Sequence, residues 1–192
     1  SVLKYSSLKS IKPDVTVAIP SYKRVDTIKE AVDSALKQKT TYAYIIMVVD
    51  DSGENNDIDT LMEAYVNKYE NILYYKNESN LGQAGNWNRC MELSPSRWTI
   101  LLHDDDMLKC QYIQTVMPIA IRTNCSLLGV FQEKYDLINH RDNRGKKFNK
   151  KQTFAQEILS KLRSGAAFQI DKTDVFQFIL PSPGCWLIDK DK

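Results

Sequence analysis

Three consecutive carboxylates, Asp104, Asp105 and Asp106, are the strongest candidates for chemistry in this sequence. They directly follow residues 99–102, an apolar run that predicts a buried strand of a parallel sheet. Adjacent carboxylates repel one another, and this destabilises the fold unless a cation lies among them. Because side chains alternate along an extended chain, we expect Asp104 and Asp106 on one side. Such a pair suits Mg²⁺ or Mn²⁺, although an acidic run is also typical of a solvated loop.

Polar loops follow two other predicted strands. The strand at residues 15–19 is followed by Pro20, Ser21, Tyr22, Lys23 and Arg24. The strand at residues 44–49 is followed by Asp50, Asp51, Ser52 and Gly53. Loops that follow parallel strands emerge at one edge of a sheet, so we expect all three loops to meet. A turn at residues 80–86 opens a helix whose N-terminus can face an anion. Together they offer a metal pocket and an anion cradle, although each motif alone is typical of a turn or a surface charge.

The elements that position these loops alternate between strand and helix. Apolar runs predict four strands, at residues 15–19, 44–49, 72–75 and 99–102. Apolar residues at helical spacing predict three helices, at residues 27–36, 57–69 and 83–93. Asp26 is the predicted N-cap of the first helix. This alternation with short connections predicts the α/β class, with a mainly parallel central sheet and helices on both faces.

The two ends of the chain are less regular. Residues 1–13 are polar and read as a lead-in segment. Further helices are predicted at residues 111–122, interrupted or kinked by Pro118, and at 153–162 and 173–178. Further strands are predicted at residues 127–131, extended by 135–138, and at 185–188 after a turn at 181–184. Because no internal repeat or low-complexity linker interrupts the sequence, we expect a single domain over residues 1–192.

The bulk composition is that of a globular protein. The net charge of +2 is too small to indicate a nucleic-acid partner. The exception is the basic stretch from Arg141 to Lys151, which is either a solvated surface loop or a patch that meets an anion or a membrane. The four cysteines form no CxxC pair, which indicates free thiols in a reducing compartment. No signal peptide or apolar run of about 20 residues is present, so we expect a cytoplasmic location or the inner face of the membrane.

Four segments, taken in order, resemble family 2 glycosyltransferases of the GT-A fold. They are residues 17–24, 48–53, 80–86 and 101–106. The clear resemblance spans residues 14–107, which would be the nucleotide-binding half. Residues 108–192 would be an acceptor-side half, with a fainter similarity at residues 183–187.

The resemblance implies inverting transfer from a nucleotide-diphosphate sugar, with UDP as the first expectation, to a saccharide or lipid-linked acceptor in polysaccharide biosynthesis. The residues implied at the nucleotide-sugar are Pro20, Ser21, Tyr22, Arg24, Asp50, Asp51, Asn80, Gly82, Asn86, Asp104 and Asp105. Asp51 would accept a hydrogen bond from a ring N–H of uracil or guanine. Asp104 and Asp106 would be the metal-binding DxD pair, with Asp104 also on the ribose and Asp105 near the sugar. Mn²⁺ or Mg²⁺ would bridge the phosphates and offset the charge of the departing diphosphate.

The sequence departs from the family at the catalytic base, which must take a proton from the acceptor hydroxyl. Family members carry an Asp or Glu after the acceptor-side segment. Here only Asp189 and Asp191 follow it, and we interpret both as surface charges. The base is therefore expected beyond Lys192, in which case this chain would bind donor and metal but transfer sugar poorly.

Other side chains have simpler interpretations, and two other functions compete. His103 is interpreted as positioning its loop, and Trp87 and Trp98 as core or semi-buried aromatics. A phosphoacceptor receiver domain also carries acid pairs and Mg²⁺, but it needs a lysine after a late strand, for which Lys134 is a displaced candidate. A nucleotidyltransferase of related fold needs a glycine-rich phosphate loop, and residues 21–24 contain no glycine.

Overall fold

The computed structural model describes residues 1–8, 12–129, 135–136, 141–142 and 185–191. The chain divides into two compact units, residues 1–129 with 183–192, and residues 130–182. In the second unit, β7 (Tyr135–Asp136) pairs antiparallel with β8 (Arg141–Asp142). The first unit contains a seven-stranded sheet in the order β1-β4-β3-β2-β5-β9-β6. A single domain over the whole chain stays a prediction.

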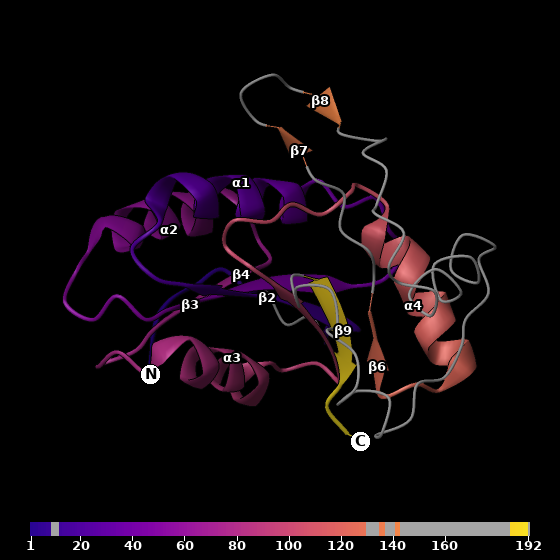
Figure 1. The fold of residues 1–192 in the computed structure, drawn as a ribbon. Helices are drawn as coiled ribbons and strands as arrows, with labels where there is room; N and C mark the ends of the chain where they lie inside the picture. The colour runs from indigo at the N-terminus through magenta and orange to yellow at the C-terminus, as the bar shows by residue number, and fades with distance from the viewer. Residues whose placement is uncertain (9–11, 130–134, 137–140, 143–184, 192) are drawn as a thin grey trace, which may run out of the picture. The chain divides into compact units, whose positions relative to one another are not determined.

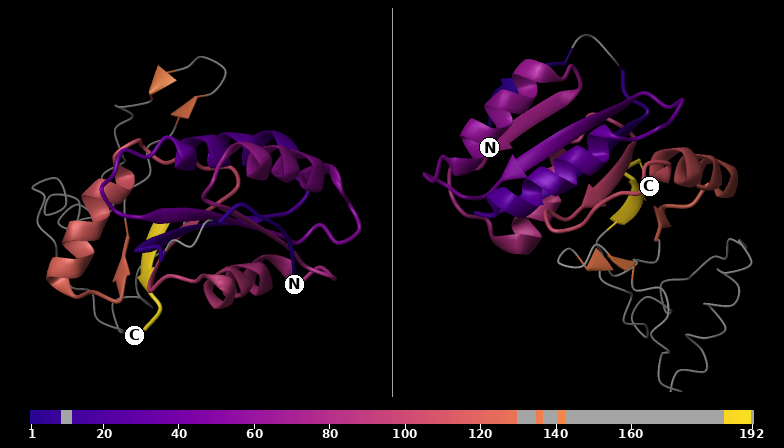
Figure 2. Two further views of the ribbon diagram at one scale, coloured as in Figure 1. Left: turned by 180° about the vertical axis from the view of Figure 1, so that it is seen from behind. Right: turned by 90° about the horizontal axis from the view of Figure 1, so that it is seen from above.

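The centre of the sheet is parallel, as predicted. Its four strands are β2 (Val15–Ser21), β3 (Tyr44–Asp50), β4 (Ile72–Lys76) and β5 (Trp98–Leu102). One face is covered by α1 (Val25–Leu36) and α2 (Asp57–Lys68), and the other by α3 (Gly82–Leu93) (Figure 1). The view from behind in Figure 2 shows α3 on the face opposite to α1 and α2. The α/β class with helices on both faces is therefore confirmed.

Burial on both faces explains why the central strands read as continuous apolar runs. Every residue of β2 and β5 is buried. Helix α1 contributes Ile28, Ala31, Val32 and Ala35 to the core, at the spacing of one helix face. On the other face, Cys90 of α3 belongs to a cluster with Ala18, Met47, Val49 and Leu101, among others. The core therefore holds the carboxyl ends of β2, β3 and β5 at one edge of the sheet.

Both edges of the sheet contain antiparallel strands. The prediction of a lead-in at residues 1–13 is wrong, because β1 (Val2–Ser6) pairs with β4. The side chains of β1 are mostly exposed, so the sequence of β1 does not alternate between apolar and polar residues as a half-buried strand would. Tyr5 stacks on Tyr74, with ring centroids 5.9 Å apart. On the other side, β9 (Cys185–Asp189) lies between β5 and β6 (Leu127–Leu128) and is antiparallel to both.

Three local expectations need correction. Pro20 lies inside β2, where it is tolerated because β2 pairs with β5 only as far as Ala18. Asp26 is not an N-cap, since α1 begins at Val25, and Asp26 lies in its first turn. Helix α4 (Tyr112–Thr123) continues through Pro118, which lies on its exposed side. There, water can satisfy the carbonyl that loses its hydrogen-bond partner.

Several predicted elements lie outside the described residues. They are residues 130–131 and 137–138 of the predicted strands, the basic residues 143–151, the helices at 153–162 and 173–178, and residues 181–184 of the turn. Cys90, Cys110 and Cys125 are free thiols. In the described part of the chain, no helix is long and apolar enough to span a bilayer.

Candidate functional site

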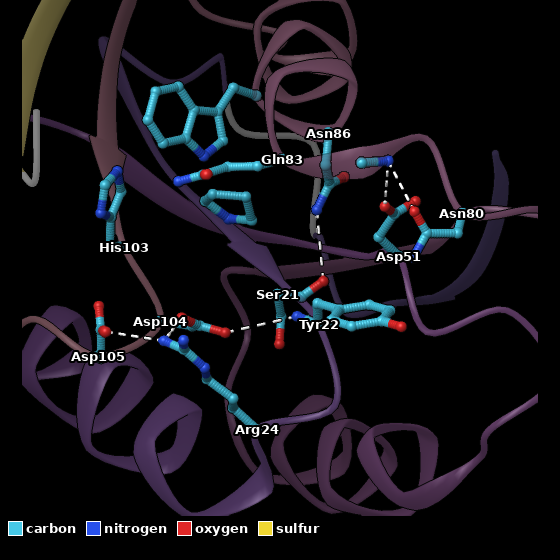
Figure 3. Close-up of a pocket in the computed structure, with 13 residues that line it drawn as sticks. Ser21, Tyr22, Arg24, Asp51, Asn80, Gln83, Asn86, His103, Asp104 and Asp105 are labelled. Atoms are coloured by element: carbon cyan, nitrogen blue, oxygen red, sulfur yellow. Dashed lines mark hydrogen bonds and ion pairs between the residues drawn. The ribbon is translucent and has the colours of Figure 1, made fainter.

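A cavity of about 460 Å³ opens where the carboxyl ends of β2, β3 and β5 meet the N-terminus of α3. Its lining consists of Pro20, Ser21, Tyr22, Arg24, Asp51, Asn80, Gly82, Gln83, Asn86, Trp87, His103, Asp104 and Asp105. Figure 3 shows Asp51 and Asn80 on one side of this cavity, and His103 and Asp105 on the other. The structure thus brings together the polar loops that the sequence predicted to converge.

All but one of the residues assigned to the nucleotide-sugar line this cavity. The exception is Asp50, whose side chain is fully buried and accepts a hydrogen bond from the Tyr74 hydroxyl at 3.0 Å. Asp50, the last residue of β3, contacts Tyr74, whose hydroxyl also reaches Asp59 of α2, whereas the next residue, Asp51, faces the N-terminus of α3. Burial raises the pKa of Asp50, while hydrogen bonds from Ser52 and Tyr74 and the charge of Lys76 oppose that rise. Asp50 therefore supports the loop from behind and does not present its carboxylate to the cavity.

Asp51 holds the N-terminus of α3. Its Oδ1 accepts from the backbone N–H of Leu81 at 2.9 Å, and its Oδ2 accepts from Leu81 and Gly82 at 3.0 Å. These are donors that a helix leaves unpaired at its start, so the carboxylate acts as a cap from another element. The helix N-terminus, which the sequence offered as an anion cradle, is thus already occupied by Asp51. The Leu81 N–H is shared between both oxygens, so these donors and Asn77 leave about one of the four lone-pair sites of the carboxylate for a ligand.

A buried amide pair, Asn77 and Asn86, fixes the position of Asp51. Asn77 Nδ2 donates to Asp51 Oδ1 at 2.8 Å and to Asn86 Oδ1 at 3.1 Å. Asn86 Nδ2 donates in turn to the carbonyls of Val49 at 3.0 Å and Ser21 at 3.4 Å. Asn86 thereby joins the ends of β2 and β3 to α3. No sequence pattern points to Asn77, because its partner Asp51 lies in a distant part of the chain.

The triple aspartate forms a turn. Strand β5 ends at Leu102, and the N–H of Asp106 donates to the carbonyl of His103 at 3.2 Å. Extended geometry therefore does not persist beyond the strand, and the reason for pairing Asp104 with Asp106 is lost. Instead, ligand atoms of His103, Asp105 and Asp106 all lie within 4.8 Å of one another. Asp106 does not line the cavity, but its neighbour Asp105 does.

This cluster has the chemistry of a divalent-metal site. Two carboxylates and an imidazole form a ligand set that suits Mn²⁺. The two carboxylates alone would also suit Mg²⁺. Ligand atoms on opposite sides of such an ion stand about 4.2 Å apart, twice a bond of about 2.1 Å, so the cluster needs little adjustment. His103 Nε2 is buried and has no hydrogen-bond partner among the described residues, which leaves it able to coordinate. His103 was predicted only to position its loop.

Arg24 balances the acidic side of the cavity. Its Nη1 lies 2.7 Å from Asp105 Oδ2 and 3.4 Å from Asp104 Oδ1, and its side chain is half exposed. Burial raises the pKa of Asp104, whereas the charge of Arg24 and the N–H of Tyr22 act against that rise. A cationic side chain thus stands where an anionic ligand would otherwise meet only carboxylates.

Two residues of α3 complete the wall, and sequence reasoning missed their role. Gln83 and Trp87 stand one helical turn apart, and both line the cavity. Trp87 is partly buried against the core, as expected, and its ring centroid also lies 4.9 Å from that of His103. The signal that could have found them is their i, i+4 spacing behind the turn at Asn80.

The late acids differ from each other. The interpretation of Asp189 as a surface charge is wrong, because its side chain is fully buried and Arg97 donates to it at 3.0 and 2.7 Å. Asp191 is exposed, as expected. Asp189 therefore ties β9 to the start of β5.

Part of the chain is similar to named proteins. The WfgD protein of Escherichia coli, a UDP-Glc:alpha-D-GlcNAc-diphosphoundecaprenol beta-1,3-glucosyltransferase, is 27% identical over 133 residues, or 69% of this chain and 49% of WfgD. TuaG of Bacillus subtilis, a putative teichuronic acid biosynthesis glycosyltransferase, is 29% identical over 115 residues, or 60% of this chain and 45% of TuaG. The chain thus spans less than half the length of these curated relatives.

The fold and the family agree. The crystal structure of Staphylococcus aureus TarS 1-349 superposes with a TM-score of 0.54 at 19% identity, covering 71% of this chain and 38% of TarS, which shows a shared fold. The family model described as Glycosyl transferase family 2 matches residues 16–191, a range that runs from β2 past the end of β9 and includes every residue of the cavity wall. This chain therefore belongs to glycosyl transferase family 2.

Proposed function

We propose that this chain is the donor-binding part of an inverting glycosyltransferase. It would move a sugar from a UDP-sugar to a hydroxyl of a saccharide or lipid-linked acceptor, assisted by Mn²⁺ or Mg²⁺. The observation that carries the proposal is the single cavity with Asp51 on one side and the acidic turn on the other. A nucleoside diphosphate would match this arrangement once a divalent cation is bound, because its ring N–H would face Asp51 and its negative diphosphate would face the cation at the acidic turn.

The Asp51 side of the cavity would hold the base. A carboxylate accepts from the ring N–H of uracil, which also has carbonyls for nearby amide donors such as that of Asn80. The N–H groups of Asn77, Leu81 and Gly82 keep Asp51 in place, so the one acceptor site that they leave is oriented before the ligand arrives. Pre-orientation of this kind strengthens binding, because less freedom is lost.

The acidic turn would hold the diphosphate. His103, Asp105 and Asp106 would coordinate the cation, and Arg24 would contribute a second positive charge. When bound, the ion supplies charge stabilisation for the departing diphosphate. Asp104 would contact the ribose, because its carboxylate lies between Tyr22 and Arg24 on the cavity wall.

Relatives support UDP as the nucleotide. The name of WfgD specifies a UDP-glucose donor and a diphosphoundecaprenol-linked acceptor. TarS has been solved in complex with UDP and with UDP-GlcNAc. These are properties of those proteins, and they make a UDP-sugar and a saccharide or lipid-linked acceptor the first candidates here.

A thermal-shift panel of UDP, GDP, CDP and dTDP, with and without Mn²⁺, tests the proposal. At a hundredfold excess over Kd, UDP with Mn²⁺ should raise Tm by about 5–10 °C, and UDP alone by much less. Asp106→Ala should abolish the dependence on Mn²⁺, whereas Glu63→Ala, which removes an exposed carboxylate of α2, should not. No shift with any nucleotide in the wild-type protein would refute the proposal, and a larger shift with GDP would reassign the donor.

A further inference from the structure

Lys76, the last residue of β4, has a buried ammonium group that the proposed function does not use. The residue is 5% exposed and does not line the cavity. Its Nζ donates to the Asn55 carbonyl at 2.6 Å, to Asn56 Oδ1 at 3.0 Å and to Asp59 Oδ1 at 2.8 Å. A buried charge is costly unless it is paired in this way, so the contacts constrain every group involved.

These contacts hold the connection between β3 and α2. Asn55 and Asn56 belong to the connection, and Asp59 lies in the first turn of α2. Lys76 is also the register partner of Asp50, and its Nζ lies 3.9 Å from Asp50 Oδ2. The Tyr74 hydroxyl contacts both Asp50 and Asp59, so two carboxylates share one hydroxyl and one ammonium. Without the ammonium, the carboxylates would face each other with only that hydroxyl between them.

The connection leads directly to the base side of the cavity. Asp50 Oδ1 accepts from the N–H of Ser52 at 2.9 Å, which sets the turn that presents Asp51. Ser52 Oγ accepts from the N–H of Lys23 at 2.9 Å, next to Tyr22 and Arg24 of the cavity wall. Lys23 has a φ of 57°, a left-handed conformation that a non-glycine residue rarely adopts without such support. A displacement of the connection between β3 and α2 would therefore move two parts of the cavity wall, Asp51 and Tyr22, which would surround the base of the nucleotide.

We propose that Lys76 is a positioning residue for donor recognition: it fixes the Asp51 and Tyr22 walls against a uracil-type base without touching the ligand. The inference rests on the proposed function and extends it to a residue outside the cavity. It predicts a selective effect, because the metal cluster is formed by the turn after β5, and Arg24 is held to that same turn by Asp105 at 2.7 Å. A loss of Lys76 should weaken binding of the base and leave binding of a metal-bound diphosphate unchanged.

The test compares UDP with inorganic pyrophosphate, each with Mn²⁺, by calorimetry on wild-type protein and Lys76→Met. We expect Kd for UDP to rise about tenfold and Kd for pyrophosphate to stay within about twofold. Lys76→Arg keeps the positive charge, so its Kd for UDP should stay within about threefold of the wild-type value. Lys68→Met, which removes an exposed lysine from α2, should change neither Kd. If Lys76→Met does not fold, Asp59→Asn replaces it in the same comparison. We expect its Kd for UDP to rise about threefold and its Kd for pyrophosphate to stay unchanged.

The outcomes separate the inference from the proposed function. Equal weakening of UDP and pyrophosphate, or no weakening in folded Lys76→Met, would overturn the role of Lys76 and leave the proposed function intact. Wild-type protein that binds pyrophosphate as tightly as UDP would also overturn it, because no base recognition would exist to be positioned. Wild-type protein that binds neither probe would overturn the proposed function itself.

Discussion

Asp50 and Asp51 are neighbours in the chain, but they face opposite sides of the sheet. Asp50 is buried between Tyr74 and Lys76 and shapes the turn through Ser52. Asp51 receives the N-terminal N–H groups of α3 and lines the cavity. A pair of adjacent acids after a strand can thus serve two purposes, because strand geometry separates the side chains.

Replacing Asp51 should affect stability and binding together. Asp51→Ala removes the acceptor for Leu81 and Gly82, and we expect the free energy of unfolding to fall by about 1–2 kcal/mol. Asp51→Asn keeps one acceptor oxygen, so its free energy of unfolding should fall by about half as much. Urea unfolding measures the loss, with the exposed Asp57→Ala as the control. An Asp51→Ala variant as stable as wild type would contradict the capping role.

Asp50 should make stability depend on pH. Its pKa is raised above the ordinary value of 3.8, chiefly by burial. A carboxyl group with a higher pKa in the folded state binds more protons when folded. Its contribution is therefore fully present below the unfolded pKa and is lost as pH rises through the folded pKa. Relative to Asp50→Asn, wild-type protein should have a greater free energy of unfolding near about pH 4 than near about pH 7. Urea titrations at both pH values check the sign, and the opposite trend would show that Lys76 and the hydrogen bonds outweigh burial.

An ion pair reinforces the backbone pairing that places strand β9 beside β5. Trp98 is the register partner of Asp189, and the neighbouring Arg97 closes the pair with two hydrogen bonds. The Arg97 guanidinium also lies 5.3 Å from the Trp98 ring centroid. The pair fixes the register of a strand that adjoins the one leading into the metal cluster.

Removing only one partner of this ion pair should destabilise the protein more than removing both partners. Arg97→Met leaves the carboxylate of Asp189 buried without its guanidinium, so this variant should have the lowest Tm. The double variant Arg97→Met with Asp189→Asn removes the uncompensated charge and should recover part of the loss. Thermal unfolding of both variants decides the order. A double variant that unfolds below Arg97→Met would contradict a dominant role for the buried charge.

The parallel centre of the molecule could be read from the sequence, because each central strand is buried on both faces and the helices show their apolar stripes. Strand β1 could not, since backbone pairing holds it and its side chains are mostly exposed. The grouping of His103 and Asp105 with Asp106 could not either, because the chain turns after Leu102 and does not stay extended. The roles of Lys76 and Asn77 could not be predicted, because a sequence alone does not show which distant residues contact one another.

The order of strands also has a consequence for synthesis. Strand β5 pairs with β2 on one side and with β9 on the other, and all of residues 130–182 lie between β5 and β9 in the chain. At a ribosomal rate of roughly 5–20 residues per second, about 80 residues separate the two strands, a delay of about 4–16 seconds. During that interval the nascent sheet exposes one edge of β5, and this edge is open to pairing with another chain. A chaperone that covers this edge, or a fast-translating stretch of messenger RNA, would therefore raise the yield of folded protein.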